Sequence, residues 1–183
     1  SSTSRGLGDV YKRQGFDAIA HSMTTIATGG YSTTDGSIGS FESWPIDLIA
    51  TVGMIIGSLP FILYLKTLQG SYSALWQDSQ VQWFISLVVI IVLAVTAKLW
   101  LSSELESTQA LRYAAFNVVS IITGTGYATS DYSQWGSFAV PVFFFIMFVG
   151  GCAGSTTCGI KIFRFQVLYA AARAQLHQLL QPH

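Results

Sequence analysis

The sequence predicts an all-helical transmembrane protein, and three features carry that prediction. Of its 183 residues, 51% are hydrophobic and only 10% are charged, whereas a soluble domain carries about 25% charged residues to cover its surface. Three long stretches, residues 48–65, 79–97 and 132–160, contain no Asp, Glu, Lys or Arg. Each can supply a bilayer-spanning helix of ~20 residues. Finally, part of the chain aligns with another part of itself without a gap.

Residues 1–14, SSTSRGLGDVYKRQ, differ in character from the rest of the chain. They are polar, hold three of the nine basic residues and lack the apolar core of a signal peptide. We interpret them as a non-native leader that resembles translated vector or adapter sequence. The helical protein is therefore expected to start near Gly15, and the chain is expected to be a fragment.

The first half should contain a short helix, a polar loop and a spanning helix. Residues 15–26 form a helix that is too short to cross a membrane, and the Gly/Ser/Thr-rich segment after it cannot stay helical. Pro45 suits the first turn of a helix and precedes the spanning stretch 46–65. Pro60 lies inside this stretch and should kink it, which a membrane bundle tolerates. Residues 66–80 form a polar connector, expected on the cytoplasmic side.

The second half should contain a spanning helix, a short helix and an interrupted apolar helix. Residues 81–101 form the spanning helix, with tryptophans near both ends that suit the two interfaces. Residues 108–122 form the second short helix. The strongly apolar run 141–149 begins at a proline and breaks at GGCAGSTTCG, residues 150–159. A helix with basic residues then resumes, either amphipathic or partly embedded in the membrane.

The internal repeat becomes visible at an offset of 96 residues, which places Tyr31 on Tyr127. FDAIAHSMTTIATGGYSTTD then aligns with RYAAFNVVSIITGTGYATSD, and Pro45 aligns with Pro141. Internal repeats are a common building rule of membrane transport proteins. The unit is a spanning helix, a short helix, a Gly-rich loop and another spanning helix.

This unit predicts an ion filter. A short helix that ends in irregular backbone inside a membrane is tolerated only where it lines a cavity. Its C-terminus favours a cation, and glycines allow carbonyl groups to point inward and replace the hydration shell of that cation. A single Thr-Gly-Gly-Tyr is also a common turn, so the filter interpretation depends on the two copies in register. The candidate residues, which resemble the Gly-Tyr filter of potassium channels and would bind potassium, are Thr28, Gly29, Gly30, Tyr31, Thr123, Gly124, Thr125, Gly126 and Tyr127.

Three motifs together resemble the Trk/Ktr/HKT superfamily of potassium transporters, most closely the bacterial Trk-type membrane subunit. They are FDAIAHSMTTIATGGYST, FNVVSIITGTGYATSDYS and FVGGCAGSTTCGIKIFR. The resemblance implies four helix–pore-loop–helix repeats around one pore, of which this chain would supply about half. Residues 15–65 would be the pore loop and second helix of repeat two, residues 66–80 the cytoplasmic connector, and residues 81–183 repeat three. It also implies a multi-pass protein of a bacterial inner membrane that forms a homodimer and binds a cytoplasmic nucleotide-binding regulatory subunit.

The Gly-rich break resembles the intramembrane loop that, in this superfamily, lies under the filter and gates the pore. Glycines interrupt the helix there and supply backbone freedom, while the hydroxyl groups can satisfy freed backbone groups. A static kink with close packing of small residues is the alternative. The candidate gate residues are Gly150, Gly151, Gly154, Ser155, Thr156, Thr157 and Gly159.

The charged and polar residues outside these motifs give weaker indications. The basic residues Lys66, Lys161, Arg164 and Arg173 should lie on the cytoplasmic side. Both filters would then face outward, near the acidic residues Asp35, Glu42, Glu104, Glu106 and Asp131. These carboxylates would either concentrate cations or be ordinary solvated charges. Cys152 and Cys158 are expected to be two small buried thiols, and His21 a packing residue rather than a proton-linked site.

Other functions are less well supported by the sequence. A net charge of zero gives no indication of nucleic acid binding. No Ser/His/Asp or paired-carboxylate arrangement argues for an enzyme, and no cofactor is expected beyond potassium as the transported ion. The alternatives kept open are an integral membrane enzyme with polar Gly/Ser/Thr substrate-binding loops and, more weakly, a non-transporting assembly subunit.

Overall fold

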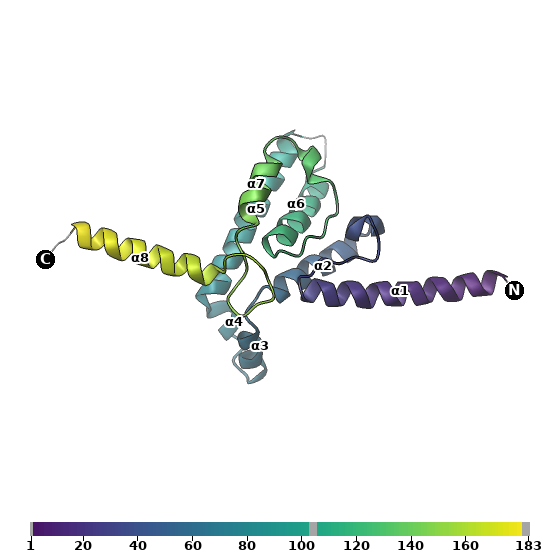
Figure 1. Cartoon of the computed structure of the whole chain (residues 1–183), viewed down its shortest axis with the longest axis horizontal. Coiled ribbons are helices and arrows are strands. Elements are labelled where there is room, and N and C mark those ends of the chain that lie inside the picture. Colours follow the sequence, from purple (N-terminus) through teal and green to yellow (C-terminus); the bar gives the residue numbers. More distant parts are fainter. Residues whose placement is uncertain (1, 103–105, 181–183) are drawn as a thin grey trace.

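The structure is a computed structural model that describes residues 2–102 and 106–180, with side chains from residue 14 onward. Its described elements are all helices (Figure 1). The only strand-like pairing in the described part of the chain is a single parallel bridge between Val149 and Ile160. The prediction of an all-helical protein is therefore confirmed.

The first helix is longer than expected. Helix α1 covers Ser2–Ile26 without a break, so the helix does not begin near Gly15. Residues 2–14 contain no proline, and two glycines in a helix interior cost only about 1 kcal/mol each relative to alanine. Composition had set this segment apart, but the backbone continues through it as helix.

The first spanning stretch is broken into two helices. A short helix η1 (Ser37–Phe41) leads into α2 (Trp44–Gly57), which has proline in its first turn as expected. Helix α3 (Phe61–Leu68) follows after a break, and the two axes differ by 92°. The proline before α3 cannot donate a backbone hydrogen bond and disfavours helical geometry in the residue before it. The expected kink is therefore a sharp corner.

The second half follows the predicted order closely. The connector contains the single-turn helix α4 (Ala74–Gln77), and then α5 covers Ser79–Ser102. Helix α6 (Ser107–Ile122) is the second short helix, and η2 (Tyr132–Trp135) lies in the loop after it. Helix α7 (Ala139–Ile146) is followed by the irregular Gly-rich segment and then by α8 (Ile162–Leu180).

Helices α5, α6 and α7 form the centre of the molecule, with α2 on the other side of α6 (Figure 1). One cluster of buried side chains joins α5, α6 and α7 through residues such as Leu99, Val118 and Phe143. A second cluster joins α2, α5 and α6 through Met54, Phe84 and Phe116. Helix α6 contributes to both clusters, so it is held on two faces.

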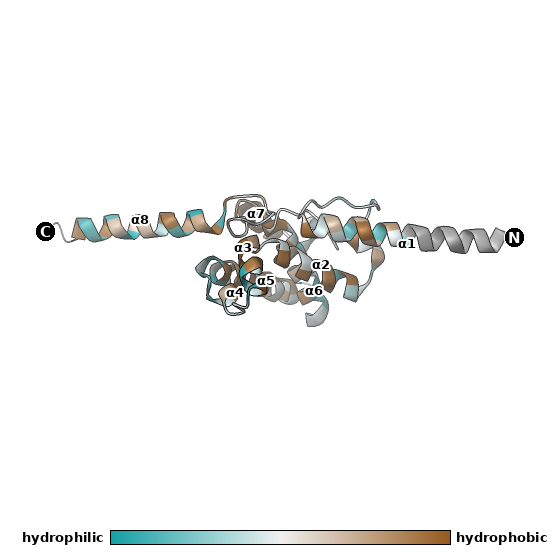
Figure 2. Ribbon diagram, turned by 90° about the horizontal axis from the view of Figure 1, so that it is seen from below, coloured by the Kyte–Doolittle hydropathy of each residue, from teal (hydrophilic) through white to brown (hydrophobic). Residues whose placement is uncertain are grey.

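The two terminal helices extend from this centre in opposite directions (Figure 1). Figure 2 shows hydrophilic and hydrophobic residues along the whole of α8, and only Ile162 of this helix is buried. Within the described residues, α5 alone is long and apolar enough to cross a membrane, and α2 with α3 passes the same test as a bent pair. The described part of the fold thus contains one apolar span, one bent span, and the helices α1 and α6, which end beside Gly-rich segments.

Candidate functional site

The first predicted filter segment begins where α1 ends. The amide groups of Ala27, Thr28 and Gly29 donate to carbonyl oxygens in the last turns of the helix at 3.0, 3.1 and 2.8 Å. The chain then turns back along the helix. Thr28 has a φ of 48° and Gly30 a φ of 70°. Both residues therefore have the left-handed backbone conformation, and one residue lies between them.

The second segment repeats this geometry after α6. Thr123, Gly124 and Thr125 donate to helix carbonyl groups at 3.0, 3.0 and 2.9 Å, in the register of the first segment. Gly124 and Gly126 have φ values of 73° and 83°, and these positions align with Thr28 and Gly30 at the offset of the repeat. The internal repeat is therefore a repeat of backbone conformation as well as of sequence.

The alternation of left-handed residues with others has a chemical consequence. In an extended strand, successive carbonyl groups point to opposite sides. When residues with positive and negative φ alternate, every second peptide plane is rotated relative to its place in an extended strand. Neighbouring carbonyl oxygens can then point to the same side. Such a row of oxygens can surround a dehydrated cation, and each row here lies beside the C-terminal end of a helix, which carries a partial negative charge.

A hydroxyl group from α1 and one from α6 each hold the carbonyl oxygen of a filter tyrosine. Thr24 Oγ1 donates to Tyr31 O at 3.0 Å, and Ser120 Oγ donates to Tyr127 O at 2.7 Å. The two pairs are again equivalent in the repeat. Each filter segment is therefore tied to its own helix at the end where it leaves the turn.

The two filter segments lie against each other. A Cβ atom placed on Gly30 would come within 1.7 Å of Thr125 O, so only glycine allows this approach. Tyr127, 1% exposed, extends its hydroxyl into the first hairpin, where it donates to Tyr31 O at 3.3 Å and hydrogen-bonds with Thr24 Oγ1. Tyr31, by contrast, is 79% exposed. The second hairpin thus packs onto the first through backbone and tyrosine contacts.

The Gly-rich segment after α7 is an ordered loop that folds back on itself. Gly150 N donates to Ile160 O and Ile160 N donates to Phe148 O, both at 2.8 Å, which closes the base of the loop. A Cβ on Gly150 would lie 2.1 Å from the carbonyl oxygen of Cys158. The close approach of the two arms therefore requires glycine at this position.

This loop contacts the chain at the ends of both α1 and α6. Thr156 Oγ1 lies 3.1 Å from Ile26 O, at the end of α1, and accepts a hydrogen bond from Thr28 Oγ1 at 3.2 Å. On the other side, a Cβ on Gly124 would lie 3.0 Å from Cys158 Cβ. The structure thus brings the predicted gate residues together with both predicted filter segments.

The corner between α2 and α3 supports the loop. Ser58 O, freed by the break, accepts from Cys152 N at 3.0 Å, and Phe61 N donates to Gly154 O at 3.1 Å. Lys161 Nζ lies close to the loop oxygens, at 3.0 Å from Thr157 Oγ1 and 3.4 Å from Ser155 O, and it also donates to Thr157 O. Backbone hydrogen bonds and one ammonium group therefore hold the loop in place.

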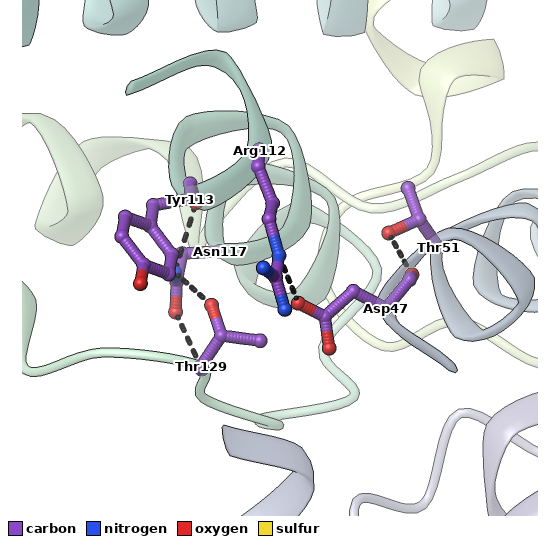
Figure 3. Close-up of polar contacts among 6 residues, drawn as sticks. All are labelled: Asp47, Thr51, Arg112, Tyr113, Asn117 and Thr129. Carbon is purple, nitrogen blue, oxygen red and sulfur yellow. Dashed lines mark hydrogen bonds and ion pairs between the residues drawn. The ribbon is translucent and has the colours of Figure 1, made fainter. Parts of the chain in front are cut away.

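An ion pair joins the two repeats near the filters. Arg112 Nε on α6 donates to Asp47 Oδ2 on α2 at 2.7 Å, and the side chains are 21% and 5% exposed (Figure 3). Thr51 lies one helical turn after Asp47, and its Oγ1 donates to the carbonyl oxygen of Asp47 at 2.7 Å. The pair fixes the first turn of α2 against the N-terminal half of α6, and no motif in the sequence predicts it.

Comparisons with known proteins place this geometry in a family. The chain matches the family model described as "TrkH: Cation transport protein" over residues 2–183. The chain belongs to the TrkH family. It is 45% identical over 166 residues to the Trk system potassium uptake protein TrkI of Halomonas elongata, which covers 90% of this chain and 33% of that protein. It is 35% identical over 170 residues to the Trk system potassium uptake protein TrkH of Escherichia coli K12. That alignment covers 92% of this chain and 35% of the Escherichia coli protein.

A solved member of the TrkH family has the same fold. The crystal structure of the potassium transporter TrkH from Vibrio parahaemolyticus superimposes with a TM-score of 0.86 and 35% identity, covering 92% of this chain and 37% of that one. The chain therefore spans about a third of the length of the relatives it matches. These findings confirm the resemblance drawn from the three motifs, and they identify a potassium uptake family of membrane proteins.

The acidic residues expected near the filters of this TrkH-family chain lie at the surface wherever the structure describes them. Of the acidic residues expected near the filters, Asp35, Glu42, Glu106 and Asp131 are exposed, and Glu104 lies outside the described residues. Hydrogen bonds from Ser133 lower the pKa of Asp131, so this carboxylate keeps its charge to a lower pH than usual. No group of three or more His, Cys, Asp or Glu side chains within the described residues could hold a metal ion.

One expectation about the cysteines is wrong. Cys152 is fully buried, as predicted, but Cys158 is exposed. The sequence gives the same expectation for both, because both thiols lie in one Gly-rich apolar segment. The loop directs them differently because Cys152 lies in its supported arm beside Ser58, whereas Cys158 lies in the arm that passes Gly124.

Proposed function

We propose that this chain forms two filter segments and the gate of a potassium conduit. Potassium is the transported ion, and it is coordinated by carbonyl oxygens of residues 28–31 and 123–127. The observation that supports this most directly is the contact between the two hairpins at Gly30 and the Thr125 carbonyl, with left-handed residues alternating at equivalent positions in both. Two relatives, TrkI of Halomonas elongata and TrkH of Escherichia coli, are named as potassium uptake proteins, which agrees with this proposal.

The Gly-rich loop at residues 150–159 is proposed to control passage. It contacts the ends of both filter turns through Thr156 and Cys158, so any displacement of the loop changes the space beside them. Its glycines permit the backbone changes that such a displacement requires. We further propose, from the superfamily resemblance, that the whole protein lies in a bacterial inner membrane as a homodimer with a cytoplasmic nucleotide-binding regulatory subunit.

A chimera provides the test. In it, this chain replaces the matching 33% of TrkI of Halomonas elongata, and the chimera is expressed in bacteria that lack their own potassium uptake. The proposal expects energised cells to take up Rb⁺, a potassium analogue, in preference to Na⁺. A chimera that is folded by size-exclusion chromatography and inserted in the membrane, yet takes up no Rb⁺, would overturn it.

Glycine substitutions then show whether the filter segments carry the flux. Gly30→Ala places a Cβ against Thr125 O, whereas Gly70→Ala, at a φ of 99°, meets nothing within 4 Å. Both variants bear the backbone strain of a left-handed alanine, about 1–2 kcal/mol. We expect Gly30→Ala to abolish selective Rb⁺ uptake and Gly70→Ala to retain it. Unchanged uptake by a fully inserted Gly30→Ala chimera would favour the integral membrane enzyme or assembly subunit instead.

A further inference from the structure

His21 makes two hydrogen bonds that connect α1 to the segment after the first filter. His21 Nδ1 donates to Asp17 O, one turn earlier in the helix, at 2.7 Å. His21 Nε2 lies 3.0 Å from the hydroxyl of Ser32, the residue that follows the filter tyrosine. The side chain is 8% exposed, so it is a buried polar bridge between the helix and the returning chain.

Asn117 makes the corresponding bridge in the second hairpin. Asn117 Nδ2 donates to Tyr113 O, one turn earlier in α6, and to Thr129 Oγ1, both at 2.9 Å (Figure 3). Thr129 lies just after the second filter tyrosine. Asn117 is 1% exposed, and it occupies the repeat position of His21.

The two side chains share a hydrogen-bonding role although their chemistry differs. Each bonds a carbonyl oxygen four residues earlier and a hydroxyl group beyond the filter. An amide side chain does not titrate, so proton transfer cannot be the property that the two positions share. What they share is a hydrogen bond between the helix and the chain that returns from the filter.

We propose that His21 and Asn117 are positioning residues that set the ion selectivity of the two filter segments. The inference rests on the conduit proposed above. Within each hairpin, the hydroxyl of Thr24 or Ser120 holds the tyrosine carbonyl group, and the His21 or Asn117 bridge lies one helical turn away. Two fixed points prevent the carbonyl row from closing around a smaller ion, which is one way that a filter discriminates against Na⁺.

A packing role makes a different prediction. The His21 ring also contacts Phe41 edge-on, with 5.4 Å between ring centroids. If packing alone mattered, leucine would replace histidine with little effect, and asparagine would leave a gap. If the hydrogen bonds matter, asparagine should replace histidine because it performs this task in the second hairpin.

The experiment compares His21→Leu, His21→Asn and Asn117→Leu in the TrkI chimera, measuring the ratio of Rb⁺ to Na⁺ uptake at matched protein levels. We expect both leucine variants to lower this ratio about tenfold, the effect of losing a buried hydrogen-bonded contact, and His21→Asn to remain near the parent value. Ser22→Val is the control, because Ser22 is exposed, hydrogen-bonds only within its own helix, and aligns with Val118.

Each outcome bears on the inference. The positioning role is overturned if His21→Leu leaves the ratio of Rb⁺ to Na⁺ uptake unchanged, or if His21→Asn lowers it as much as His21→Leu does. In either case, Rb⁺ uptake by the parent chimera still supports the conduit. No uptake by a folded parent overturns both. If His21→Leu does not reach the membrane, Ser32→Ala removes only the hydroxyl group on the other side of the bridge. It should lower the ratio in the same direction, and an unchanged ratio overturns the inference.

Discussion

The hydroxyl of Tyr127 lies 3.3 Å from the carbonyl oxygen of Tyr31, so the filter tyrosine of one repeat hydrogen-bonds to that of the other. The same hydroxyl also meets Thr24 Oγ1, which itself holds Tyr31 O. Three oxygen atoms from two repeats therefore meet at one point. Because Tyr31 is the last residue of the first proposed filter segment and Tyr127 the last of the second, this contact couples the two segments.

Tyr127→Phe removes this contact while keeping the ring. We expect a lower ratio of Rb⁺ to Na⁺ uptake in the chimera and a loss of about 1 kcal/mol in stability, the typical contribution of one hydrogen bond. Tyr72→Phe serves as the control because Tyr72 is 77% exposed. Equal selectivity in both variants would show that the tyrosine contact does not affect the filter.

The buried ion pair between Asp47 and Arg112 should be important for stability. Arg112→Ala leaves the carboxylate of Asp47, 5% exposed, without its partner, and breaking a buried pair in this way costs about 3–5 kcal/mol. The double variant Asp47→Asn with Arg112→Gln removes both charges and should recover much of this loss. Thermal unfolding of the purified chimera in detergent measures both effects. A double variant no more stable than Arg112→Ala would mean that the charge itself is not what destabilises the single variant.

The sequence was sufficient for the elements that depend on local signals. The expected helices at 81–101 and 108–122 agree with α5 (Ser79–Ser102) and α6 (Ser107–Ile122) within two residues. Apolar length defined the first, and the Gly-rich segment after Ile122 defined the end of the second. The gapless repeat also predicted the equivalence of the two turns, which their backbone hydrogen bonds bear out.

Features that depend on contacts between distant segments could not be predicted in this way. Asp47 and Arg112 are 65 residues apart, and neither the helix periods nor the repeat relates them. Pro60 predicted a kink, but the 92° corner depends on the loop at Cys152 and Gly154, which satisfies the backbone groups freed there. The bridges of His21 and Asn117 were missed for a similar reason, although their equal place in the repeat was a signal that could have found them.

Lys161 should restrain the proposed gate. Its ammonium group donates to oxygen atoms of Ser155 and Thr157, and a hydrogen bond to a charged group contributes about 1.5–3 kcal/mol. Lys161→Met should therefore raise the open fraction of the loop about tenfold, seen as faster Rb⁺ uptake by unstimulated cells. Lys66→Met, at the exposed end of α3, is the control for loss of one positive charge. Slower or unchanged uptake in Lys161→Met would argue against a restraining role.

The two cysteines of the loop offer a direct measurement of its exposure. Cys158 is exposed and lies beside Gly124 at the base of the second filter turn, whereas Cys152 is 0% exposed. In a chimera whose other cysteines are replaced by serine, a charged methanethiosulfonate reagent should modify Cys158 much faster than Cys152, as measured by mass spectrometry. The added cation beside the filter should also slow Rb⁺ uptake, and Cys158→Ser should abolish this inhibition. Inhibition that persists in Cys158→Ser, or equal labelling of both thiols, would contradict the placement of this arm of the loop next to the filter.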